Sequence, residues 1–103
     1  MKVIDLSGKT ALITGGSSGL GLAIAREFVI CGASVCILAR DGSRVDAAVD
    51  QLSQAGSQRV IGYACDITDQ KQTAEVLSQA TRAAGSFDIL VNNAGSSYRR
   101  NAD

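Results

Sequence analysis

The order of short apolar runs and helically spaced apolar residues is the feature that most constrains how this chain folds. Four short runs, at residues 10–14, 34–39, 59–64 and 89–91, are rich in aliphatic side chains, as expected of strands that are buried on both faces. Three segments between them carry apolar residues at intervals of three and four, which is the spacing of one helix face. The sequence therefore predicts the order βαβαβαβ, with a parallel sheet, right-handed connections and helices on both faces.

Small residues mark where the predicted helices begin and end. Ser43 and Asp46 have the spacing of a capping box, which predicts the start of the second helix. Thr68 or Asp69 can cap the third helix. Each helical segment is followed by a glycine, which is typical of helix C-termini: Gly32, Gly56 and Gly85.

Composition and charge exclude several classes of protein. Ten basic and ten acidic residues give a net charge of zero, so no nucleic-acid-binding field is expected. The chain has no histidine, and its three cysteines lack metal-ligand spacing, so we predict no metal site and reduced, small core residues at Cys31, Cys36 and Cys65. Neither a signal peptide nor a membrane span is predicted, because the most apolar stretch, 20–39, contains Arg26 and Glu27. The expected location is cytoplasmic.

A cluster of glycines joins the first predicted strand to the first predicted helix. Gly15, Gly19 and Gly21 have the spacing G-x-x-x-G-x-G, which differs from the G-x-G-x-x-G of the common dinucleotide fingerprint. Small residues at such a turn let the backbone approach a pyrophosphate, whose charge then faces the N–H groups of the helix N-terminus. The alternative is that these glycines serve only the turn and close packing. Their position directly after a buried strand favours phosphate binding.

Three motifs follow one another on the predicted elements: T-G-G-S-S-G-L-G at residues 14–21, C-D-I at 65–67 and N-N-A-G at 92–95. Together they resemble the short-chain dehydrogenase/reductase family, and the resemblance covers nearly the whole chain. It implies an α/β fold of the Rossmann type, a doubly wound parallel sheet, and an oxidoreductase that uses NAD(P).

The resemblance also implies a set of cofactor-binding residues. The glycine turn would lie against the phosphates, and Asp66 and Ile67 against the adenine. Asn92, Ala94 and Gly95 would border the adenosine ribose and the path to the nicotinamide. For Asp66 the alternative is a carboxylate at a helix N-terminus. For Asn92 and Asn93 it is hydrogen bonding at a strand end, a role that coexists with cofactor binding in this family. The full set is Gly15, Ser17, Ser18, Gly19, Leu20, Gly21, Arg40, Asp66, Ile67, Asn92, Ala94 and Gly95.

The choice between NADP and NAD depends on the end of the second predicted strand. There a carboxylate would bind the ribose hydroxyls of NAD, whereas an arginine would pair with the 2′-phosphate of NADP. Ala39 and Arg40 resemble the NADP(H)-preferring members, so NADP(H) is favoured. Asp41 keeps NAD(H) open, because it lies near the usual spacing of a ribose-binding acid. A further alternative is an exposed ion pair between Arg40 and Asp41.

The catalytic residues that the resemblance implies are not found in this sequence. The family uses a serine and a tyrosine followed four residues later by a lysine. Here Tyr63 is followed at that distance by Ile67, and Tyr98 by Ala102. We therefore assign no catalytic residue and expect residues 1–103 to be the dinucleotide-binding half of a single Rossmann-type domain, truncated after the fourth strand and inactive alone.

The parent protein is expected to transfer hydride between NADP(H) and a carbonyl or alcohol substrate, without nucleic-acid or membrane partners, and to form a homo-oligomer. The sequence does not specify the substrate. Two alternatives remain: a non-catalytic nucleotide-binding module, and a truncated gene product without activity. With the fourth strand left as an open edge, we expect the chain alone to be marginally stable and to self-associate.

Overall fold

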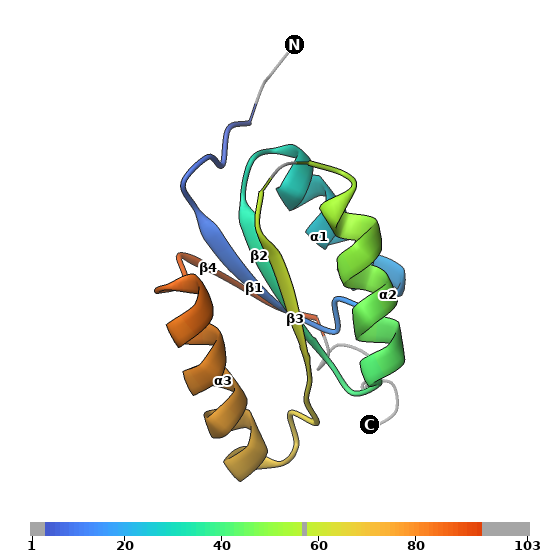
Figure 1. Cartoon of the computed structure of the whole chain (residues 1–103), viewed down its shortest axis with the longest axis vertical. Helices are drawn as coiled ribbons and strands as arrows, with labels where there is room; N and C mark the ends of the chain where they lie inside the picture. Colours follow the sequence, from blue (N-terminus) through green and yellow to red (C-terminus); the bar gives the residue numbers. More distant parts are fainter. Residues whose placement is uncertain (1–3, 57, 94–103) are drawn as a thin grey trace, which may run out of the picture.

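The computed structural model describes residues 4–56 and 58–93, and it has the predicted alternation of strands and helices (Figure 1). Strand lengths match the apolar runs, and each helix follows a strand after a short turn. The elements are β1 (Thr10–Thr14), α1 (Gly19–Ile30), β2 (Ser34–Ala39), α2 (Gly42–Ser53), β3 (Val60–Ala64), α3 (Gln70–Ala84) and β4 (Ile89–Asn92).

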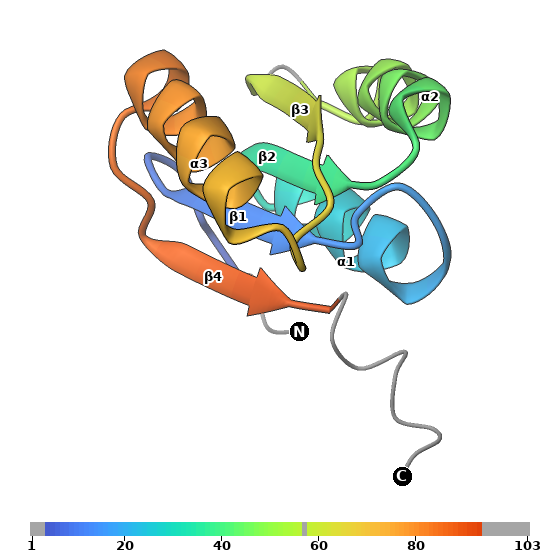
Figure 2. The same ribbon diagram turned by 90° about the horizontal axis from the view of Figure 1, so that it is seen from below.

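The four strands form one parallel sheet in the order β3-β2-β1-β4. Helices α1 and α2 cover one face and α3 covers the other, as Figure 2 shows. The prediction of a doubly wound Rossmann-type sheet is therefore confirmed. Because all strands are parallel, their carboxyl ends lie at the same edge of the sheet.

Burial on both faces explains why β2 is a continuous apolar run. Its side chains alternate between two cores, with Ile37 packed under α1 and α2, and Cys36 and Leu38 packed under α3. All three are at most 1% exposed. The strand β4 differs, since Leu90 is 67% exposed. Hydrophobic burial of the two central strands therefore holds the layers together.

The helix caps correct one expectation. The capping box at Ser43 and Asp46 is wrong: α2 begins at Gly42, and its N-cap is Asp41, whose carboxylate accepts hydrogen bonds from the backbone N–H groups of Ser43 and Arg44. The helix also ends at Ser53, before Gly56. For α3 the second of the two expected caps is confirmed, because Asp69 accepts from the N–H of Gln72 at 3.0 Å.

The cap of α3 gives a first testable prediction. Asp69→Ala should lower the free energy of unfolding by about 1 kcal/mol, because it leaves an N–H of the first turn without its acceptor. Asp69→Asn is the matched control. Its amide oxygen can still accept the hydrogen bond, so the free energy of unfolding should fall by only a few tenths of about 1 kcal/mol. Urea unfolding of the two variants measures the difference, and an equal loss in both would contradict a capping role.

The three cysteines are not bonded to one another. All three thiols are free; Cys36 and Cys65 are buried and Cys31 is half-buried. Burial raises the pKa of Cys36 to about 12, so this thiol stays protonated.

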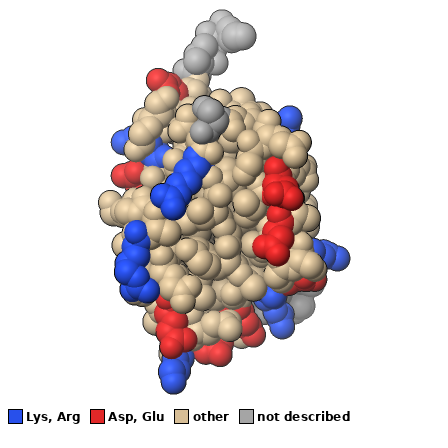
Figure 3. Space-filling model, viewed as in Figure 1, with Lys and Arg blue, Asp and Glu red and all other residues tan. Residues whose placement is uncertain are grey.

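Within residues 4–56 and 58–93, no group of side chains has the composition of a metal site, and no helix is long and apolar enough to cross a membrane. Acidic and basic side chains are interspersed on the face seen in Figure 3.

Candidate functional site

A cleft of about 540 Å³ lies at the edge where the parallel strands end. Its walls come from the turn after β1, the end of β2 with the start of α2, and the segment after β3. In open α/β sheets, the crevice outside the carboxyl ends of the strands is the usual place for a ligand. Its volume lies within the range of small-molecule sites, which is about 300–1,000 Å³.

The glycine turn forms one wall of the cleft. Gly15 and Gly19 have φ values of 69° and 56°, a left-handed conformation that glycine adopts without steric cost. The N–H of Gly15 donates to the carbonyl oxygen of Leu38 at 2.7 Å, which ties the turn to β2. At Gly21 a Cβ would overlap the carbonyl oxygen of Gly15 and lie 2.8 Å from Nδ2 of Asn93. Only glycine at this position lets α1 pack directly against the turn.

The N-terminus of α1 differs from those of α2 and α3. Its N-cap residue, Ser18, makes no side-chain capping bond. By contrast, Asp41 and Asp69 cap the other two helices. Ser17 and Ser18 both line the cleft. The positive end of the α1 dipole and its first N–H groups are thus placed beside the cleft without a side-chain carboxylate, which suits an anionic ligand.

The end of β4 is hydrogen-bonded to the turn. The Thr14 hydroxyl donates to Oδ1 of Asn92 at 3.0 Å, and Nδ2 of Asn93 donates to the carbonyl oxygen of Gly15 at 3.3 Å. The strand-end bonding considered for Asn92 is therefore observed. Asn93 lines the cleft, whereas Asn92 does not. These two amides hold the first and fourth strands in register at the edge where the cleft opens.

Asp66 and Ile67 form the wall contributed by the segment after β3. Oδ1 of Asp66 accepts from both the hydroxyl and the backbone N–H of Thr68, at 2.7 and 3.0 Å. These bonds, and to a smaller extent the charge of Arg40, hold the pKa of Asp66 below its usual value. Asp66 does not cap α3, so that alternative is wrong. Its carboxylate is anionic at neutral pH and fixed by a local turn.

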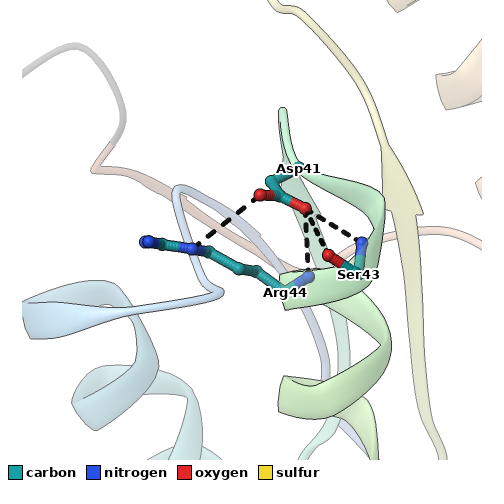
Figure 4. Close-up of polar contacts among 3 residues, drawn as sticks. All are labelled: Asp41, Ser43 and Arg44. Atoms are coloured by element: carbon teal, nitrogen blue, oxygen red, sulfur yellow. Dashed lines mark hydrogen bonds and ion pairs between the residues drawn. The ribbon is translucent and has the colours of Figure 1, made fainter.

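Charged side chains gather where β2 passes into α2 (Figure 4). Oδ1 of Asp41 accepts from the Ser43 hydroxyl at 2.8 Å and from two backbone N–H groups, and its Oδ2 lies 3.9 Å from Nε of Arg44. The bonds from Ser43, followed by that from Arg44, lower the pKa of Asp41. The ion pair between Arg40 and Asp41, considered as an alternative, is not found: Arg44 is the partner of Asp41. Arg40 instead lies close enough to Asp66 to influence its pKa.

The structure brings together half of the residues predicted for the site. Those lining the cleft are Gly15, Ser17, Ser18, Arg40, Asp66 and Ile67. Four others lie in the adjoining elements but do not line it: Gly19, Leu20, Gly21 and Asn92. Ala94 and Gly95 lie outside the described residues. The lining also contains Asp41, which the sequence offered only as an alternative, for NAD(H). Three further polar residues of the lining were missing from the prediction: Arg44, Thr68 and Asn93.

Each omitted residue had a weak signal in the sequence. Asn93 is part of the N-N-A-G motif, and Thr68 stands two residues after Asp66, a spacing that favours a local turn. Arg44 follows Arg40 by four residues and falls in the first turn of a helix that starts at the same sheet edge. In each case the residue was visible, but its position beside the cleft required the fold.

Comparison with known proteins agrees with this geometry. The family model described as short chain dehydrogenase matches residues 9–103. A short chain dehydrogenase of Pseudocercospora fijiensis is 42% identical over 91 residues, which cover 88% of this chain and 29% of that protein. A fatty acyl-CoA reductase of Acinetobacter baylyi is 38% identical over 96 residues, which cover 93% of this chain and 32% of that protein.

Solved structures show the same relationship. L-sorbose reductase from Gluconobacter frateurii, determined with NADPH and L-sorbose, has a TM-score of 0.84 and 38% identity over 89% of this chain and 35% of its own. The chain thus spans about a third of the length of these relatives. Since the family model covers nearly all of the sequence and the fold agrees, this chain belongs to the short-chain dehydrogenase family.

Proposed function

We propose that the cleft binds NADP(H) and that the protein containing this chain transfers hydride between the nicotinamide and a carbonyl or secondary alcohol. The observation that carries the cofactor choice is Arg40, which lines the cleft at the end of β2. Membership of an oxidoreductase family and the NADPH bound to L-sorbose reductase support it. The coenzyme itself supplies the hydride chemistry, and the residues described below supply binding and orientation.

The pyrophosphate fits the turn between β1 and α1. Gly15, Ser17 and Ser18 line the cleft there, and the first N–H groups of α1 have no capping side chain. The absence of a Cβ at Gly21 keeps the turn close to the helix. Backbone N–H groups at a helix N-terminus are a common binding site for phosphate oxygens. We propose that Gly19 and Leu20 contribute to this site through the same turn.

The adenosine fits the other two walls of the cleft. Asp66 and Ile67 would contact the adenine, with the Asp66 carboxylate held in place by Thr68. The residues proposed for the adenosine ribose and the path to the nicotinamide are Asn92, Ala94 and Gly95. Of these, Asn92 has its side-chain oxygen bonded to Thr14, so we propose that it acts by fixing the strand end beside the ribose.

The state of Asp41 favours NADP(H) over NAD(H). A ribose-binding carboxylate must be available to accept hydrogen bonds from two hydroxyls. In this structure Oδ1 of Asp41 already accepts three hydrogen bonds at the N-terminus of α2, and Oδ2 lies beside Arg44. Arg40, in contrast, lines the cleft directly after β2, and we propose that its positive charge pairs there with the 2′-phosphate.

We also propose that the residues that exchange a proton with the substrate lie in a part of the protein that this chain does not contain. The chain covers about a third of its relatives, and the tyrosine and lysine of the family pattern are not found in it. Residues 1–103 would then be the dinucleotide-binding half of one domain. The full-length protein should oxidise NADPH in the presence of at least one member of a panel of ketones, aldehydes and acyl thioesters. Failure with every member would count against the proposed activity.

Arg40→Gln should weaken NADPH binding about tenfold, because one charge-assisted contact to the 2′-phosphate is lost. NADH binding should change less than twofold, since NADH has no 2′-phosphate. Calorimetric titration of the full-length protein gives both dissociation constants. Arg82→Gln is the matched control, because Arg82 lies on α3, bonded to Ser78 and away from the cleft. An equal loss of affinity for both coenzymes would contradict the role of Arg40.

A further inference from the structure

We propose that Arg44 is a second specificity-determining residue, which binds the 2′-phosphate of NADP(H) together with Arg40 and is partly neutralised by Asp41. This inference rests on the proposed function of the cleft. It assigns a role to Arg44, a charged residue of the lining that the sequence analysis did not consider.

The placement of Arg44 is the first argument. Arg40 is the residue directly after β2, and Arg44 lies in the first turn of α2. Both residues line the cleft, and only three residues separate them in the chain. Both guanidinium groups carry a permanent charge and several N–H donors. A phosphate dianion has oxygens enough to accept from two such groups, and paired arginines therefore discriminate it from a hydroxyl more strongly than one arginine does.

The second argument is that Arg44 is held only weakly by its partner. Its Nε lies 3.9 Å from Oδ2 of Asp41, which is too long for a hydrogen bond, and its side chain is 67% exposed. Exposed ion pairs of this kind contribute little to stability. Arg44 can therefore turn toward a bound phosphate at small cost.

Hydrogen bonds hold the Asp41 carboxylate in place, whereas the Arg44 side chain is held only weakly. Its Oδ1 accepts hydrogen bonds of 2.8, 3.0 and 3.3 Å, from the Ser43 hydroxyl and two backbone N–H groups. The same bonds lower its pKa, so the carboxylate keeps its negative charge at neutral pH. Its charge offsets part of the attraction that Arg44 exerts on a phosphate. Asparagine is an equally good N-cap, so Asp41→Asn removes that charge and leaves the helix capped.

The test compares two adenosine ligands on the full-length protein by calorimetric titration. Adenosine 2′,5′-bisphosphate carries the 2′-phosphate, and 5′-AMP is the matched ligand without it. Arg44→Gln should raise the dissociation constant of the bisphosphate about fivefold and change that of 5′-AMP less than twofold. Arg44→Lys, which keeps the charge, should restore about half of the lost factor. Asp41→Asn should lower the dissociation constant of the bisphosphate about twofold and leave that of 5′-AMP unchanged.

Each outcome separates this inference from the proposed function. If Arg40→Gln weakens binding of the bisphosphate but not of 5′-AMP, and Arg44→Gln changes neither, the role of Arg44 is refuted while NADP(H) binding stands. If Arg44→Gln weakens both ligands equally, the residue is structural and the inference fails. If the wild-type protein binds the two ligands with equal affinity, the 2′-phosphate is not recognised, and both the proposed cofactor preference and the role of Arg44 are overturned.

Discussion

Gly21→Ala should weaken NADPH binding more than a hundredfold and lower the free energy of unfolding by about 3 kcal/mol, the upper part of the range for overpacked positions. The added Cβ would overlap the carbonyl oxygen of Gly15 and crowd Nδ2 of Asn93. The first of these atoms is backbone and cannot rotate away, so α1 or the turn must move. The turn forms one wall of the cleft and α1 begins directly after it, so either movement changes that wall. A displacement of about 1 Å is enough to cost a factor of this size.

Gly42→Ala is the matched control for this prediction. Gly42 is the first residue of α2, its φ is negative, and a Cβ there would lie 3.6 Å from Cβ of Ala64, an ordinary contact distance. We expect a change within about 0.5 kcal/mol, as for other substitutions without overlap. Urea unfolding and NADPH titration of both variants give the two quantities. Wild-type affinity in Gly21→Ala would show that the turn does not bind the phosphates.

Gly62→Val should lower the free energy of unfolding by about 3 kcal/mol, because it overpacks the contact between β3 and α2. A Cβ at Gly62 would lie 2.6 Å from Cγ1 of Val45, 2.8 Å from Cγ2 of Val49 and 3.0 Å from Cγ1 of Ile37. Two of these neighbours are β-branched valines on a helix, which have few alternative rotamers. Valine has a higher strand propensity than glycine, but at this position the steric overlap outweighs that gain.

The comparison variant for Gly62 is Ala64→Val in the same strand. Ala64 is exposed and follows Gly62 by two residues, so its side chain points to the same side of the sheet at the end of β3. Valine should be accommodated there with a change of less than about 0.5 kcal/mol. Urea unfolding of both variants measures the difference. A loss of stability in Ala64→Val as large as in Gly62→Val would mean that β3 rejects any larger side chain and that the helix contact is not the cause.

The arrangement of the elements could be predicted because each strand is buried on both faces. The run Ser34–Ala39 is apolar at successive positions, and in the structure Cys36 and Ile37 pack against different helices. This pattern, together with helical segments long enough for crossovers, leaves a parallel doubly wound sheet as the favoured arrangement. The glycine turn after β1 and the N-N pair at the end of β4 were placed correctly for the same reason, since the ends of parallel strands meet at one edge.

Local features that depend on contacts across the fold could not be predicted. Asp41 and Ser43 are both good N-cap residues, and the choice between them depends on where β2 ends, which sequence patterns locate only to within one or two residues. Gly62 was simply part of a predicted strand, and its role is evident only from Val45 and Val49 above it. Arg44 reaches the cleft because α2 starts there, whereas sequence spacing alone made Arg40 and Asp41 the obvious pair.

The most direct test of NADP(H) binding at the carboxyl edge of the sheet is amide hydrogen exchange of the full-length protein with and without NADPH. We predict slower exchange at residues 15–19, 40–44 and 65–68, the three walls of the cleft, and unchanged exchange on the outer face of α3, at residues 74–82. Protection confined to other segments, or unchanged exchange in all three walls at saturating NADPH, would contradict the assignment of this cleft as the coenzyme site.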